Sequence, residues 1–235
     1  MTKNPFYLVS IQALMFMILP MVAYVWMPGH QSPWYTFGIY PREIHGLWGL
    51  IFAPFIHGST SHLFSNVLPL GVLSFLSLWV LRRHFYTLTL GILVLGGLLT
   101  WFIGRPSWHI GASGLIYGYV GFLIASGIVA ENVRLLGLTL LTVFLYGSLV
   151  WGLLPLQPDI SFESHISGGI AGLALAFLFR SKLPKKKTYA WEHEEDLEEQ
   201  PNSLAEEESN PLPPSVRVQY EWVSQRKNQD IKPQE

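Results

Sequence analysis

Six apolar segments divide the chain and constrain its fold more than any other feature of the sequence. They span roughly residues 6–27, 62–81, 85–103, 111–130, 133–154 and 164–180. A transmembrane α-helix needs about 20 apolar residues, because each residue rises about 1.5 Å through a hydrocarbon layer about 30 Å thick. Five segments match this length well, and the last is short but within range. The pattern predicts an all-α membrane protein with six transmembrane helices.

The composition agrees with a membrane protein. Half of the residues (50%) are hydrophobic and only 13% are charged, which is too apolar for an ordinary soluble domain. The absence of cysteine excludes disulfides, thiol catalysis and cysteine-bound metals. The first apolar segment is longer than the apolar region of about 7–15 residues in a signal peptide, and no small-residue cleavage site follows it. We therefore expect it to be a retained helix.

Charge is divided unequally along the chain. Residues 1–187 carry 11 Lys and Arg against 4 Asp and Glu, whereas residues 188–235 carry 4 against 12. The second part is also poor in aliphatic residues, a composition typical of disordered segments. We expect a six-helix transmembrane domain at 1–183 and an acidic, disordered cytoplasmic tail at 184–235. No nucleic-acid-binding pattern is present.

The positive charges predict how the helices are oriented. With the amino terminus in the cytoplasm, nine Lys and Arg residues of the first part lie on the cytoplasmic side and only Arg42 and Arg105 lie outside. Both termini are then cytoplasmic, and the second, fourth and sixth helices run inward from the outer surface. Residues 28–61, rich in aromatic side chains, form a long first outer loop that we expect at the membrane interface.

Polar residues recur at the outer ends of the three even-numbered helices. His62 begins the second helix, Ser113 the fourth and His165 the sixth. Polar groups within spanning helices are usually functional. A serine hydroxyl becomes a strong nucleophile only when a base takes its proton, which makes Ser113 and His165 a candidate catalytic dyad. Glu163 is two residues from His165 and faces another side of the helix, so we expect no third, acidic member.

Three groups near this pair can stabilise an oxyanion. His62 and Asn66 lie four residues apart on one helix face, and both can donate hydrogen bonds. The backbone N–H of Ser113 lies near a helix amino terminus, where negative charge is favoured. Together these groups are a candidate oxyanion hole.

Glycines on the fourth and sixth helices predict close contact between the two. They recur at the spacing that lets membrane helices approach, at Gly114, Gly118, Gly121, Gly168, Gly169 and Gly172. Tyr117, four residues after Ser113, can support the histidine ring. Each feature also has a purely structural explanation, since serine commonly bonds to its own helix, asparagine can join helices, and glycine stripes pack.

Three sequence blocks resemble a known family. They are His57-Gly-Ser-Thr-Ser-His62-Leu-Phe-Ser-Asn66, Gly111-Ala112-Ser113-Gly114 with Tyr117, and His165-Ile-Ser-Gly168-Gly169-Ile-Ala-Gly172. In this order, over about residues 45–180, the chain resembles the rhomboid family of intramembrane serine proteases. The resemblance implies a six-helix rhomboid bundle that hydrolyses membrane-anchored proteins, without a metal or other cofactor.

The resemblance also implies a role for each residue. Ser113 would be the nucleophile, His165 the base, and His62, Asn66 and the Ser113 amide the oxyanion hole. The supporting residues would be Tyr117 beneath His165, a structural His57, and the motif glycines Gly111, Gly114 and Gly169. Residues 155–163 would form the mobile cap over the site. The chain departs from the family where Gly49 follows Trp48 in place of the usual arginine.

Other functions remain open from the sequence. A catalytically silent, rhomboid-like protein that binds membrane clients is the main alternative, although such relatives lack the serine or the histidine. A metalloenzyme using His57, His62 and His165 lacks a His-Glu-x-x-His motif. A transporter would be expected to carry charged groups near the bilayer midplane, and none is seen. The charge pattern fits a bacterial inner membrane, and a eukaryotic organelle is the alternative.

Overall fold

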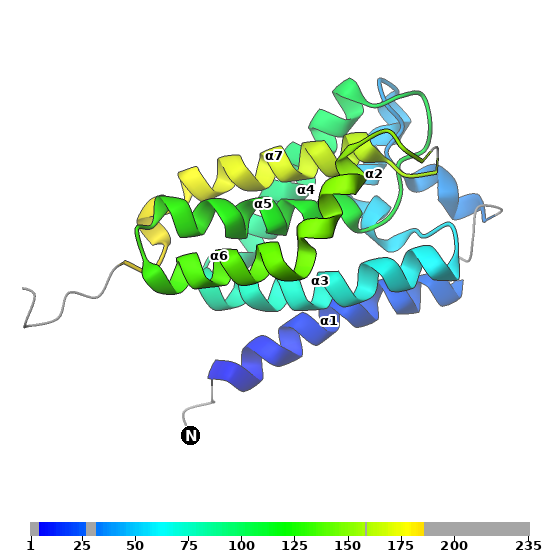
Figure 1. The fold of residues 1–235 in the computed structure, drawn as a ribbon. Coiled ribbons are helices and arrows are strands. Elements are labelled where there is room, and N and C mark those ends of the chain that lie inside the picture. Colours follow the sequence, from blue (N-terminus) through cyan, green and yellow to red (C-terminus); the bar gives the residue numbers. More distant parts are fainter. Residues whose placement is uncertain (1–4, 27–31, 158, 186–235) are drawn as a thin grey trace, which may run out of the picture. The chain divides into compact units, whose positions relative to one another are not determined.

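The computed structural model describes residues 5–26, 32–157 and 159–185, which form a bundle of helices (Figure 1). Its long helices are α1 (Pro5–Trp26), α3 (Thr60–Val80), α4 (Phe85–Ile103), α5 (Ser113–Val129), α6 (Val133–Tyr146) and α7 (Phe162–Leu178). Over these ranges the extended pairing is limited to an isolated bridge between Ile39 and His109. The prediction of an all-α fold is confirmed. The predicted acidic tail lies, from residue 186 onward, outside the described residues.

Each predicted apolar segment overlaps one of these long helices. By length and composition, α1, α3, α4 and the stretch Val133–Leu153 are able to cross a membrane. The other two, α5 and α7, have 17 residues each and are shorter apolar helices. Both carry many buried residues along their length.

The fifth apolar segment, 133–154, is helical from Val133 to Leu153 as expected, but the type of helix changes along it. α6 ends at Tyr146, and the chain continues as the 3₁₀-helix η4 (Gly147–Leu153). Gly147 and Gly152 lower the helix propensity of this stretch, and Pro155 cannot donate the backbone hydrogen bond that would extend it. The α-helix therefore changes to the tighter 3₁₀-helix, which ends before the loop that leads to α7.

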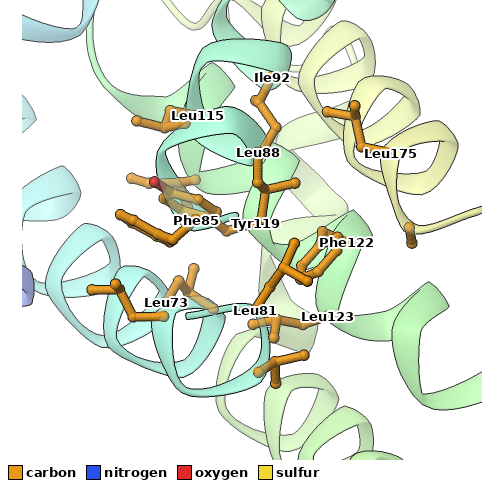
Figure 2. Packing of buried hydrophobic residues seen from close by; sticks show 14 of the residues in the cluster. Leu73, Leu81, Phe85, Leu88, Ile92, Leu115, Tyr119, Phe122, Leu123 and Leu175 are labelled. Carbon is orange, nitrogen blue, oxygen red and sulfur yellow. The ribbon is translucent and has the colours of Figure 1, made fainter. Parts of the chain in front are cut away.

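The core lies around α5. Phe85 of α4 stacks on Tyr119 of α5 with ring centroids 5.8 Å apart (Figure 2). The Tyr119 hydroxyl lies 2.8 Å from Thr89 Oγ1. Both rings are fully buried. Leucines from α3, α4 and α7 surround them, at Leu73, Leu88 and Leu175. This packing joins α3, α4, α5 and α7 in one core.

The connection between α1 and α3 folds into short turns. It contains η1 (Pro33–Phe37), η2 (Ile44–Trp48), α2 (Gly49–Phe52) and η3 (Ala53–Phe55). Several of its large apolar side chains are exposed, including Ile44, Trp48 and Ile51. An exposed apolar face of this kind is suited to a lipid or interfacial environment.

Arg42 anchors this connection to the end of α4. It adopts a left-handed backbone conformation, with φ of +62°, and its Nη1 donates to the carbonyls of Phe102 and Gly104 at 3.2 and 2.9 Å. A cation at a helix carboxyl end is favoured by the helix dipole.

Gly49 follows Trp48 where the family usually has arginine, and this difference has a steric explanation. A Cβ at Gly49 would overlap the backbone of Gly38 and Ile39, so the backbone at this position leaves no room for a side chain. Close packing between the two segments thus requires glycine where the family commonly has arginine. Arg42 anchors the loop instead, through its bonds to the end of α4.

Candidate active site

The candidate residues stand at the amino-terminal ends of three helices. His62 is the third residue of α3, Ser113 the first of α5 and His165 the fourth of α7. Serine caps start two of these helices: Ser59 Oγ accepts from His62 N at 3.1 Å, and Ser161 Oγ accepts from Ser164 N at 3.3 Å. The caps fix where each of these two helices begins and therefore where the candidate side chains point.

These residues surround one cavity of about 990 Å³. Its lining contains five of the predicted site residues: His62, Asn66, Ser113, Tyr117 and His165. Three helices and the η4 segment thus contribute to a single polar space. Tyr35, Trp108 and Trp151 line it as well, so the cavity has aromatic as well as polar walls.

Gly111 shapes the turn that enters α5. Its φ of +99° lies in the region that glycine adopts readily, and its N–H donates to Ala53 O at 2.9 Å. A Cβ here would come within 2.7 Å of His62 Nε2. The His62 ring therefore packs directly on this turn, two residues before Ser113.

Tyr117 and His165 form a stacked pair. Their ring centroids lie 4.1 Å apart and their planes differ by 11°. The Tyr117 hydroxyl donates to Leu149 O at 2.5 Å, and His165 Nδ1 lies 2.8 Å from Gly152 O. Because a carbonyl oxygen only accepts hydrogen bonds, Nδ1 carries the hydrogen. In the neutral ring Nε2 is then an acceptor, the state that a general base needs.

Glycines bring α5 and α7 together near this pair. A Cβ at Gly168 would overlap Gly114 O, one at Gly172 would overlap Gly118 O, and one at Gly121 would lie 2.5 Å from Gly169 O. Such contacts are possible only without side chains. Gly169 contributes its carbonyl, since a Cβ at that residue would meet nothing within 4 Å.

The structure contains no hydrogen bond from Ser113 to His165, both of which are described residues. In proteases without substrate such bonds are often long and tighten when substrate binds. Asn66 Nδ2 donates to His62 O at 2.7 Å within α3, while its Oδ1 is buried without a partner. Its side chain is thus partly bonded to its own helix.

The His57 ring packs against the His62 ring. His57 is fully buried, and the two rings meet edge-on with centroids 5.0 Å apart. Burial lowers the pKa of His57 to about 4; the nearby His62 adds to this, and the backbone at Phe55 partly opposes it. A neutral, buried ring here supports the position of His62 through packing.

A polar network that sequence reasoning missed joins the predicted cap to the loop before α5. Arg105 pairs with the buried Glu163 at 3.7 Å, and its Nη2 donates to Ile160 O at 2.7 Å. His109 Nδ1 lies 2.5 Å from Ser161 Oγ, and burial is the main cause that lowers the pKa of His109. Glu163 and His165 face different sides of the helix, and the Glu163 carboxylate pairs with Arg105 instead.

The family-model comparison follows the same stretch of chain. The model described as "Rhomboid domain" matches residues 45–182, which contain all of these site residues. The chain belongs to the rhomboid family. The family and the apolar helices make it an integral membrane, multi-pass rhomboid protein.

Similar proteins occur in mycobacteria. An uncharacterized protein of Mycobacterium bovis and one of Mycobacterium tuberculosis are each 38% identical over 162 residues, covering 65% of this chain and 67% of theirs. An uncharacterized protein of Mycobacterium leprae is 36% identical over 154 residues, covering 61% of this chain and 60% of its own. This rhomboid protein thus shares its domain with bacterial relatives whose names state no activity.

Proposed function

We propose that this rhomboid protein is an intramembrane serine endopeptidase that cleaves membrane-anchored proteins with a Ser113–His165 dyad. The observation that carries the proposal is that both side chains line one cavity while Gly152 O holds His165 Nδ1–H, which leaves Nε2 as the acceptor. Membership in a family of intramembrane proteases supports the same reaction.

The reaction follows from the roles of these groups. Ser113 Oγ attacks the carbonyl carbon of the scissile peptide bond as its proton passes to His165 Nε2. The carbonyl oxygen becomes an oxyanion, which the Ser113 N–H, His62 and Asn66 stabilise; Asn66 turns its amide toward the substrate for this. His165 then gives the proton to the leaving amine. Water, activated by the same histidine, hydrolyses the acyl-enzyme.

Its topology in the membrane is part of the proposal. Six spanning helices, with α5 and α7 as the short ones, place both termini in the cytoplasm and the cavity near the outer surface. The positive-inside bias of the sequence supports this orientation, and bacterial relatives support a bacterial inner membrane. The transmembrane domain spans 1–183, and the acidic segment 184–235 is a cytoplasmic tail.

The test is cleavage of a panel of tagged single-span membrane proteins by the wild type and by Ser113→Ala. We expect the wild type to cut at least one of them and Ser113→Ala to cut none. Ser148→Ala is the matched control, because Ser148 lines the same cavity from η4 and has no proposed role. Binding without cleavage by the wild type would favour the client-binding alternative, and equal cleavage by Ser113→Ala would refute the nucleophile.

A further inference from the structure

The 3₁₀-helix η4 offers two backbone carbonyls to the stacked rings. Leu149 O accepts from the Tyr117 hydroxyl, and Gly152 O accepts from His165 Nδ1. Leu149 and Gly152 are three residues apart, and residues at this spacing lie above one another in a 3₁₀-helix. One face of η4 therefore holds both members of the Tyr117–His165 pair.

The sequence leaves Gly152 O available for this contact. In a 3₁₀-helix the carbonyl of residue 152 would accept from the N–H of residue 155, but Pro155 has none. The next backbone donor, Leu156 N, donates to Leu154 O at 2.8 Å. Gly152 O thus accepts no backbone hydrogen bond from residue 155 or residue 156. It accepts one from His165 Nδ1.

Only glycine fits at position 152. A Cβ there would overlap the Tyr117 hydroxyl and lie 3.1 Å from His165 Nδ1. Gly147, at the start of the same helix, is different, because a Cβ there would meet only Val143 Cγ1 at an ordinary 3.9 Å. A side chain at 152 must therefore displace η4 or the ring pair.

We propose that Gly152, with its carbonyl left free by Pro155, is the positioning residue that fixes the tautomer and plane of His165. It takes the part that a carboxylate has in a Ser–His–Asp triad, holding Nδ1–H so that Nε2 faces the nucleophile. The proposal rests on the proposed protease function. Gly152 acts through His165 and does not itself contact the reacting atoms.

The first test compares Gly152→Ala with Gly147→Ala in a cleavage assay. We expect Gly152→Ala to lower kcat about a hundredfold with little change in KM, as a small misplacement of a catalytic group does, and Gly147→Ala to match the wild type. Tyr117→Phe should restore part of the activity of Gly152→Ala, because it removes the hydroxyl that the new methyl meets. Equal activity of the two alanine variants, or no rescue, would overturn the proposal.

A second test measures the tautomer directly. Nitrogen-15 NMR of histidine-labelled protein in detergent, with the His165 signals identified by their loss in His165→Gln, should show Nδ1–H in the wild type. Pro155→Ala restores a competing backbone donor at an exposed position, so it should shift His165 toward Nε2–H without unfolding the protein. An Nε2–H tautomer in the wild type would contradict the inference. So would a result in which neither Gly152→Ala nor Pro155→Ala changed the tautomer of His165.

The two proposals fail separately. Full cleavage by Ser113→Ala would refute the protease assignment whatever the Gly152 variants do. If Ser113→Ala were inactive and Gly152→Ala fully active, the protease assignment would hold and the role of Gly152 would be refuted. The NMR measurement does not depend on activity.

Discussion

Gly168 of α7 lies directly against the carbonyl oxygen of Gly114 on α5. Ser113 is the neighbour of Gly114, and His165 stands one turn before Gly168. The backbone contact between these two glycines therefore sets the separation between the proposed nucleophile and its base.

Gly168→Ala tests this contact. The new methyl group would overlap Gly114 O, so the helices must move apart, at a cost of about 1–3 kcal/mol that is typical of overpacking. We expect a lower thermal midpoint in detergent. Gly169→Ala is the adjacent control, because its methyl group would meet nothing within 4 Å, and its midpoint should stay close to that of the wild type. Equal midpoints for the two variants would contradict the contact.

Asn66→Ala tests the oxyanion hole. Loss of one donor to the oxyanion should lower kcat about 10²-fold and change KM little, because the interaction forms only in the transition state. Steady-state kinetics on a cleavable substrate separate the two constants. Ser61→Ala is the control, because Ser61 lines the same cavity from α3 and has no proposed role. If Asn66→Ala raised KM alone, the asparagine would bind substrate and leave the oxyanion to other groups.

His57 predicts a pH dependence of stability. The folded pKa of about 4 lies below the ordinary value of 6.5, so between these values the unfolded chain binds more protons than the folded one. Stability is full above about pH 6.5 and falls as the pH drops toward 4. In His57→Leu the loss of thermal midpoint over this window should be smaller. An identical pH dependence in both proteins would show that His57 does not titrate as proposed.

Removing only Arg105 from the Arg105–Glu163 pair should destabilise the fold more than removing both charges. Arg105→Met leaves the buried Glu163 carboxylate without its cation, which is usually more damaging than removing both charges. We therefore expect the double variant with Glu163→Gln to be more stable than Arg105→Met alone. A double-mutant cycle of unfolding midpoints measures the coupling, and additive effects would mean that the pair contributes little.

Much of the helical fold could be predicted because its signal is long and repeated. Apolar segments of about 20 residues identify the long helices by position, and glycines at regular spacing indicate that α5 and α7 approach closely. The change from α-helix to 3₁₀-helix at η4, where two glycines and then Pro155 occur, was not predicted.

The candidate site could be assembled from residue types, but its orientation could not. The partner of His165 is a backbone carbonyl, and a carbonyl is present at every residue, so no side chain identifies it. Pro155, three residues after Gly152, was the one available sign. The roles of Arg42 and Arg105 were missed for a similar reason, since both donate to backbone carbonyls that only the folded chain brings near.

Covalent labelling of the nucleophile is the sharpest test of the proposed Ser113–His165 dyad. The detergent-solubilised protein is treated with a fluorophosphonate, and the modified residue is located by peptide mass spectrometry. We expect a single adduct on Ser113, lost in Ser113→Ala and strongly reduced in His165→Gln, with Ser148→Ala labelled like the wild type. Labelling that persists in Ser113→Ala, or a wild type that resists the reagent while folded, would contradict the proposed dyad.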